Sequence, residues 1–407
     1  MGKRSGFDVR SLELSPHIAF VLPSLGAGGT EHVVSLLSNY LAGLGWIVTL
    51  FVFEDEITPF YEHDPRITIV PLGRPRRPRS RFGPVGAVRQ RVRLLRHALV
   101  ATQPDLILSF IIRTNVIAVL AATRLHIPVI VSEQNNPKRQ SPGLIWAALR
   151  RYAYTRSAGL ITMTRGAMNC FPPSMRRTGW VIPNPSYCPI PLDPRRPMDK
   201  RIVAVGRLVW QKGFDLLLHA FARIASAHPE WTLTIWGEGP ERQSLEKLLR
   251  PLGITGRAFM PGCTERPGSW LAEADILVLS SRFEGWGMVV GEAMAAGLPA
   301  VAFDCPFGPS QMIRHGYSGL LVPEGNVEAL ADALDRLCAD GNLRQKLGDA
   351  ARLDARRFAP ELILSQWEEA IVSVLAHTGS HYAKMKSPAE KLVASSVFSG
   401  SATTIVK

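Results

Sequence analysis

Two glutamates and two cations at fixed spacings are the strongest candidates for chemistry in this sequence. Glu284 lies in a glycine-rich loop after an apolar run, and Glu292 comes eight residues later, inside the helical pattern that follows. This spacing places the first carboxylate at the carboxyl end of a strand and the second one turn into a helix, facing the same cleft. A buried carboxylate beside an apolar helix start requires a polar partner, and a ligand hydroxyl is a suitable one.

Arg207 and Lys212 stand five residues apart in a loop after another apolar run. An arginine fork and a lysine point charge on one such loop can converge on a pyrophosphate. A third loop, Gly26-Ala27-Gly28-Gly29, precedes Thr30, Glu31 and His32. Clustered glycines let backbone N–H groups approach a phosphate at a helix N-terminus, although a tight strand-to-helix turn would use the same glycines.

Short apolar runs alternate with amphipathic stretches along nearly the whole chain. This alternation predicts an α/β fold with two consecutive Rossmann-like domains, each built on a parallel sheet. A proline-rich stretch from about Val181 to Pro197 indicates a linker between them. We therefore expect four parts: a first domain at 1–190, a second domain at 198–358, a helix at 359–376 that packs back on the first domain, and a flexible tail at 377–407.

The chain has a net charge of +13, and this excess is confined to one half. Residues 1–200 hold 26 Lys and Arg against 12 Asp and Glu, whereas residues 201–407 hold 21 against 22. The excess is densest from Arg74 to Arg96, which predicts an anionic partner such as a membrane surface or a phosphorylated ligand. In Val88–Val100, one helical face is apolar and Arg89, Arg93 and Arg96 line the neighbouring face. We interpret Val88–Val100 as a helix that lies on a membrane surface. The alternative is an ordinary surface helix docked on the sheet by its apolar face.

Taken together, several motifs resemble glycosyltransferase family 4, and the resemblance runs from about His17 to Leu375. The motifs are Gly28-Gly29-Thr30-Glu31, Ile182-Pro183-Asn184-Pro185, Gly206-Arg207, Lys212-Gly213, Gly237-Glu238-Gly239-Pro240 and the pair Glu284 and Glu292. The resemblance implies the GT-B fold, in which two Rossmann-like domains with parallel sheets face a cleft. It also implies retaining transfer of a sugar from a nucleotide-sugar, with UDP favoured, to a lipid-linked saccharide, with no cofactor and no metal.

The resemblance also implies a role for individual residues. Arg207 and Lys212 would hold the donor diphosphate, Glu292 the ribose, and Glu284 the hydroxyls of the donor sugar. Glu284 is the first candidate catalytic residue. Glu133 stands where many members carry a histidine, so we take it as the second candidate catalytic residue. The remaining expected donor-binding residues are Gly28, Gly29, His32, Gly237, Met260, Gly285, Met288, Val289 and Val290, with Met260 placed in a loop near the base.

Composition limits the competing functions. The five cysteines are scattered without metal-ligand spacing, and no apolar stretch is long enough to span a bilayer, which is typical of a cytoplasmic protein. With the basic segment, this predicts peripheral association with the inner face of the membrane. Nucleic acid is not an expected partner, because the segment from Arg74 to Arg96 holds only one aromatic residue, Phe82. The remaining alternatives are a sugar-nucleotide epimerase of the same layout and a non-catalytic nucleotide-sugar-binding protein.

Overall fold

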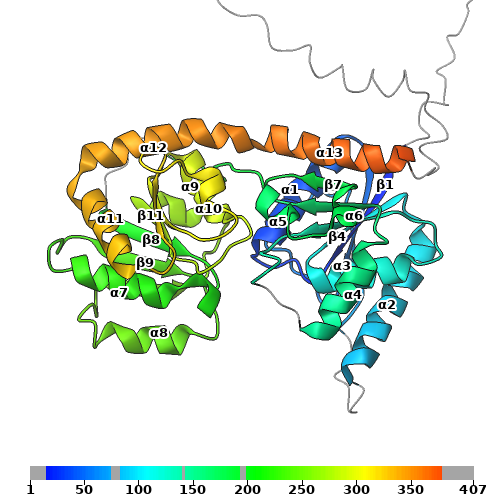
Figure 1. The fold of residues 1–407 in the computed structure, drawn as a ribbon, viewed down its shortest axis with the longest axis horizontal. Coiled ribbons are helices and arrows are strands. Elements are labelled where there is room, and N and C mark those ends of the chain that lie inside the picture. The colour runs from blue at the N-terminus through cyan, green and yellow to red at the C-terminus, as the bar shows by residue number, and fades with distance from the viewer. Residues whose placement is uncertain (1–14, 75–82, 140–142, 193–198, 378–407) are drawn as a thin grey trace, which may run out of the picture.

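Two α/β domains stand side by side in the computed structural model, and a pair of long helices runs along one side of both (Figure 1). The structure describes residues 15–74, 83–139, 143–192 and 199–377. The predicted flexible tail lies outside the described residues except for His377.

The first domain is built on a seven-stranded sheet in the order β3-β2-β1-β4-β5-β6-β7, with every neighbouring pair parallel. Its central strands are apolar and buried on both faces, as a parallel sheet covered by helices requires. The strands are β1 (His17–Leu22), β2 (Ile47–Val52), β3 (Thr68–Pro71), β4 (Leu106–Phe110), β5 (Val129–Glu133), β6 (Gly159–Thr162) and β7 (Gly179–Val181). The helices are α1 (Gly29–Gly43), α2 (Gly83–Thr102), α3 (Ile112–Ala122), α4 (Leu144–Tyr154), α5 (Arg165–Met168) and α6 (Pro173–Arg176).

The second domain has a six-stranded parallel sheet in the order β10-β9-β8-β11-β12-β13. Both sheets therefore carry the reversal of strand order that opens a crevice at the carboxyl ends of the central strands. The strands are β8 (Arg201–Val205), β9 (Thr232–Trp236), β10 (Ala258–Gly262), β11 (Ile276–Leu279), β12 (Ala300–Asp304) and β13 (Leu320–Pro323). The helices are η2 (Trp210–Lys212), α7 (Phe214–Ile224), α8 (Arg242–Leu249), η3 (Ser269–Ala272), α9 (Met288–Ala296), α10 (Pro309–Met312), α11 (Val327–Ala339), α12 (Gly341–Ala355) and η4 (Arg356–Phe358).

The last helix, α13 (Pro360–His377), crosses from the second domain to the first (Figure 1). Its Trp367 is fully buried, and the indole ring lies 5.8 Å from the ring of Phe110 at the end of β4. The Tyr40 hydroxyl on α1 donates a hydrogen bond of 2.6 Å to the Glu368 carboxylate. These contacts join α13 to the first domain, so the covalent linker is supported by a second connection between the domains.

Two strands differ from the sequence expectation. The short strand β7 pairs with β6, in a region where the apolar pattern had predicted the start of a linker. Three residues are too few to show a strand period. Met260 lies inside β10 and packs against the core of the second domain, so its expected place in a loop is wrong.

Candidate active site

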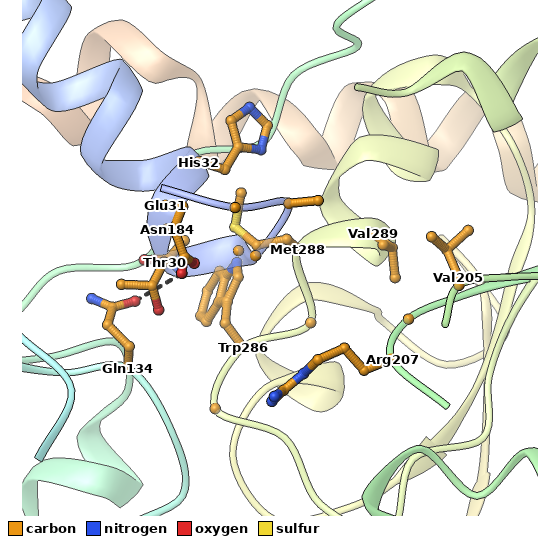
Figure 2. Close-up of a pocket in the computed structure, with 18 of the residues that line it drawn as sticks. Thr30, Glu31, His32, Gln134, Asn184, Val205, Arg207, Trp286, Met288 and Val289 are labelled. Carbon is orange, nitrogen blue, oxygen red and sulfur yellow. Dashed lines mark hydrogen bonds between the residues drawn. The ribbon is translucent and has the colours of Figure 1, made fainter. Parts of the chain in front are cut away.

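A cavity of about 640 Å³ lies between the two domains, at the carboxyl ends of both sets of strands. Its walls come from the segments that follow β1, β2, β4, β5, β6 and β7 in the first domain and β8, β9, β10 and β11 in the second. In Figure 2, Thr30, Glu31 and Gln134 lie on one side of the pocket and Arg207 reaches in from the other. The loops with the predicted motifs therefore converge on one space.

Lys212 and Glu284 form an ion pair in the second-domain wall of this cavity. The Lys212 ammonium lies 2.6 Å from Glu284 Oε1, and the Ser281 hydroxyl donates to the same oxygen at 2.6 Å. Both charged side chains are largely buried, with 19% and 8% of their surface exposed. Gly213 lets the backbone beside Lys212 pass close to the strand that precedes Glu284. A Cβ on this glycine would lie 2.1 Å from the carbonyl oxygen of Ser280. A charge-assisted pair of this kind fixes both groups before any ligand enters.

His32 on α1 and Glu292 on α9 meet across the domain boundary. His32 Nδ1 lies 3.5 Å from Glu292 Oε1, and Nε2 shares a hydrogen bond of 2.7 Å with the Tyr187 hydroxyl. The imidazole ring stacks on Tyr61, with centroids 4.4 Å apart. His32 and Glu292 both line the cavity. The first domain therefore helps to position a carboxylate that belongs to the second.

The N-termini of α1 and α9 open into the same cavity. Their N-cap residues, Gly28 and Gly287, make no side-chain capping hydrogen bond. The first N–H groups of each helix therefore have no capping side chain, and the helix dipole makes this end attractive to an anion. The two ends approach closely, since a Cβ on Gly29 would lie 3.0 Å from Met288 Cγ.

Glu133 ends β5 on the first-domain side of the cavity, with 1% of its surface exposed. The Tyr154 hydroxyl donates a short hydrogen bond to its Oε1, and Asn115 Nδ2 donates to the Tyr154 hydroxyl at 2.8 Å. Burial raises the pKa of Glu133 to about 7, although the bond from Tyr154 and the charge of Arg150 lower it. Its carboxyl group is therefore tied on one side to a polar network behind the cavity wall.

Most of the expected donor-binding residues line the cavity together. They are Gly28, Gly29, His32, Arg207, Lys212, Gly237, Gly285, Met288, Val289 and Glu292. Val290 and Met260 do not line it. Val290 is fully buried in the core, because it lies on the inward face of α9, and Met260 turns into the second-domain core from β10. The segment after β10 lines the cavity instead, through Cys263, Thr264, Pro267, Gly268 and Trp270.

The helix that carries Arg89, Arg93 and Arg96 does not offer an apolar face to solvent. Leu95 and Leu99 are fully buried in the first-domain core, and Val92 packs against the same core. Arg96 donates a hydrogen bond of 2.8 Å to the carbonyl oxygen of Thr123, just beyond α3, whereas Arg89 and Arg93 are exposed. The interpretation of this stripe as membrane-facing is wrong, because the stripe docks α2 on its own domain.

The sequence did not single out several cavity residues. Trp286 and Gln134 line it, and the Asn184 amide donates to the Gln134 carbonyl oxygen at 3.3 Å (Figure 2). Glu31 also lines it, where burial raises the pKa of this carboxyl group and the nearby charge of Arg207 lowers it. Glu31 and Asn184 lie within motifs quoted above, and Gln134 directly follows the candidate Glu133, so proximity to these residues was the available signal.

Two features are absent from the residues that the structure describes. No group of three or more His, Cys, Asp or Glu side chains there is arranged to hold a metal ion. In the same residues, every helix is too short or too polar to cross a membrane.

The fold and the cavity define a glycosyltransferase of the GT-B class, and comparison with known families agrees. Residues 28–172 match the glycosyl transferase 4-like domain, and residues 193–354 match the glycosyl transferases group 1 family. Each half of the chain is therefore similar to a glycosyltransferase domain, and the protein is an enzyme of the hexosyltransferase type.

Relatives and solved structures extend this comparison. An exopolysaccharide phosphotransferase of Streptomyces coelicolor is 29% identical over 86% of this chain, which spans 40% of that protein. An α-1,4-N-acetyl-D-galactosaminyltransferase of Campylobacter jejuni, named for an undecaprenol diphosphate-linked acceptor, is 25% identical over 88% of this chain and 98% of its own. The structure of HepE from Anabaena with UDP and glucose has a TM-score of 0.72 at 18% identity, covering 88% and 99% of the two chains, and so shares the fold.

Proposed function

We propose that the chain is a retaining glycosyltransferase of polysaccharide biosynthesis that transfers a sugar from a UDP-sugar to a lipid-linked saccharide at the cytoplasmic membrane face. The observation that carries the proposal is the convergence of Arg207, the Lys212–Glu284 pair and Glu292 on one interdomain cavity. A nucleotide-sugar presents a diphosphate, ribose hydroxyls and sugar hydroxyls, and these are the groups that such side chains bind.

In this proposal the cavity stabilises the leaving diphosphate. The bond between the anomeric carbon and the diphosphate oxygen breaks, and a bond to the acceptor oxygen forms on the same face of the sugar. The acceptor hydroxyl gives its proton to the departing diphosphate. Arg207, Lys212 and the N-termini of α1 and α9 are placed to balance the developing negative charge. Glu284 would accept hydrogen bonds from the donor sugar, and Glu292 from the ribose.

Support for the donor and the acceptor comes from the comparisons. HepE of Anabaena was solved with UDP, and the Campylobacter jejuni relative is named for a lipid-linked acceptor. The basic first half of this chain supports an acceptor that carries a diphosphate on a membrane surface.

The proposal is tested by incubating the protein with a panel of UDP-sugars and undecaprenol diphosphate-linked saccharides. We expect transfer with the anomeric configuration retained, as read by NMR of the product. Lys212→Ala and Glu284→Gln should each lower kcat by about 10²–10³-fold, the scale seen when a transition-state charge partner is removed. Glu328→Gln is the matched control, because this glutamate pairs with Arg223 on the exposed surface.

Two results would count against the proposal. Near-normal turnover of either variant would remove Lys212 or Glu284 from the site. Conversion of a UDP-sugar to its epimer without any acceptor would favour the epimerase alternative.

A further inference from the structure

The helix α4 carries apolar side chains on its outer face, where a surface helix normally carries polar ones. Leu144 and Ile145 at its start are 92% and 74% exposed, and Tyr152 is 46% exposed. Leu144 has the largest exposed fraction among the large apolar side chains that the structure describes. The inner face is apolar too, since Ala153 and Tyr154 are buried. Among the residues that the structure describes, none covers the outer apolar side chains at the start of α4.

The surroundings of this outer face are basic and contain no acidic side chain in the helices. The three neighbouring helices α2, α3 and α4 carry seven arginines and no Asp or Glu. Of these, Arg89, Arg93, Arg113 and Arg151 are exposed. Between residues 106 and 192, the only acidic residue is Glu133, which is buried. The field over α4 therefore attracts an extended anionic surface.

The start of α4 lies on the cavity side of the first domain. The helix follows β5, and Gln134 and Asn135, directly after that strand, line the cavity. A helix that follows a parallel strand begins at the carboxyl edge of the sheet, which is the edge that faces the cleft. Figure 1 shows α4 at the lower edge of this domain, and the helix packs against α3. A surface bound at Leu144 and Ile145 would therefore lie near the opening to the cleft.

We propose that Leu144 and Ile145 insert into an anionic lipid bilayer, with Tyr152 and the surrounding arginines at the headgroup level. We define these residues, Leu144, Ile145, Arg151 and Tyr152, as the α4 tip. The inference rests on the proposed function, because a lipid-linked acceptor has to be met at a bilayer surface.

The size and chemistry of the α4 tip favour a bilayer over a folded partner. A stable protein interface buries about 800 Å² on each side and has a shaped apolar centre. Two aliphatic side chains at one helix end are too few to form that centre. They suit a fluid interface, in which aliphatic groups insert a few ångströms, tyrosine lies at the boundary and arginine binds lipid phosphate.

The test is cosedimentation of the full chain with vesicles of phosphatidylcholine containing one third phosphatidylglycerol. We expect Leu144→Asp combined with Ile145→Asp to lower the partition coefficient between water and vesicles by about tenfold or more. Arg151→Glu should weaken it severalfold, and its effect should fade at high salt. The matched control is Leu353→Asp combined with Leu362→Asp, two leucines that are 55% and 53% exposed on α12 and α13, and it should bind as the wild type does.

A second measurement reports the depth of insertion. Trp146 adjoins the tip, and its ring lies under the Arg113 guanidinium at 5.2 Å. Lipids brominated near the headgroup should quench part of the wild-type fluorescence, and Trp146→Phe should remove most of that quenching.

Three results would overturn the inference. The first is that the variant with both Leu144→Asp and Ile145→Asp binds vesicles as well as the wild type does. The second is that the wild type does not bind anionic vesicles. The third is that the wild type forms a dimer in solution and this variant abolishes it. The thermal shift given by UDP is measured on the same samples and should be equal in all variants. If no nucleotide raises the Tm while the α4 tip still governs vesicle binding, the proposed function fails and the membrane surface stands.

Discussion

The two walls of the cavity are built in different ways. On the second-domain wall, charged side chains pair with one another inside the site, as Lys212 does with Glu284 at 2.6 Å. On the first-domain wall, the Glu133 carboxyl group accepts a hydrogen bond from the hydroxyl of Tyr154, which lies behind the wall. The second domain therefore presents a preformed ion pair, whereas in the first domain burial raises the pKa of the two carboxyl groups that line the cavity, Glu133 and Glu31.

This difference follows from what each wall has to recognise. A diphosphate carries the same charges in every nucleotide-sugar, so fixed cations and helix N-termini serve for any donor. In the proposed reaction the acceptor contributes a neutral hydroxyl, and a carboxyl group whose pKa is about 7 can either donate or accept a hydrogen bond there. The difference between the two walls can be tested first at the contact between them and then at the Glu133 carboxyl group.

The contact at Gly285 is where we expect the larger effect. A Cβ on Gly285 would lie 2.6 Å from the Gln134 carbonyl oxygen and 2.7 Å from Asn135 Cα, both in the first domain. Because these atoms are backbone atoms, Gly285→Ala should hold the walls apart and lower kcat/KM by about 10–100-fold. Steady-state kinetics would measure the loss, and calorimetric unfolding would show that the fold is kept.

Gly43→Ala on α1 is the control for that variant, since a Cβ there meets nothing within 4 Å. It should leave kcat/KM unchanged and stabilise the fold slightly. Wild-type kinetics in Gly285→Ala would mean that the two walls need not touch during turnover.

A smaller effect is expected from Glu133→Gln. Burial raises the pKa of the folded carboxyl group to about 7 from an ordinary value of 4.5. Because the folded state favours the protonated carboxyl group, the raised pKa adds to the free energy of unfolding in full below about pH 4.5. This contribution is lost as the pH rises through 7. Glu133→Gln should therefore be more stable than the wild type at pH 8, on the order of 2 kcal/mol, and should lose this advantage near pH 4. Urea unfolding at both pH values measures the difference, and an equal gain at both would contradict the account.

The sequence predicted the second-domain wall better than the first. Arg207, Lys212 and Glu284 lie between a strand and the next long helix, and Glu292 lies near the start of α9. Their local spacing indicated them, because such segments gather at one sheet edge. The network of Glu133, Tyr154 and Asn115 joins residues from three separate elements, which no local spacing can indicate.

One error, and one feature that the sequence did not single out, have the same physical origin. The apolar stripe of α2 had the period of a membrane-surface helix and of a docked helix alike, and only the packing of Leu95 and Leu99 distinguishes them. The exposed Leu144 and Ile145 on α4 are aliphatic residues that a sequence pattern assigns to a core. Which face of a helix is buried depends on its neighbours, so it had to be read from the structure.

The most direct test of the account is the binding of UDP measured by titration calorimetry. UDP should bind one site per chain, and Arg207→Ala should weaken its binding by about tenfold or more, the scale of one lost charge-assisted contact. Arg89→Ala should bind UDP as the wild type does, since Arg89 is exposed on α2 and is not among the residues that line the cavity. Equal affinity of Arg207→Ala and the wild type, or no binding of UDP by the wild type, would contradict the assignment of the donor site.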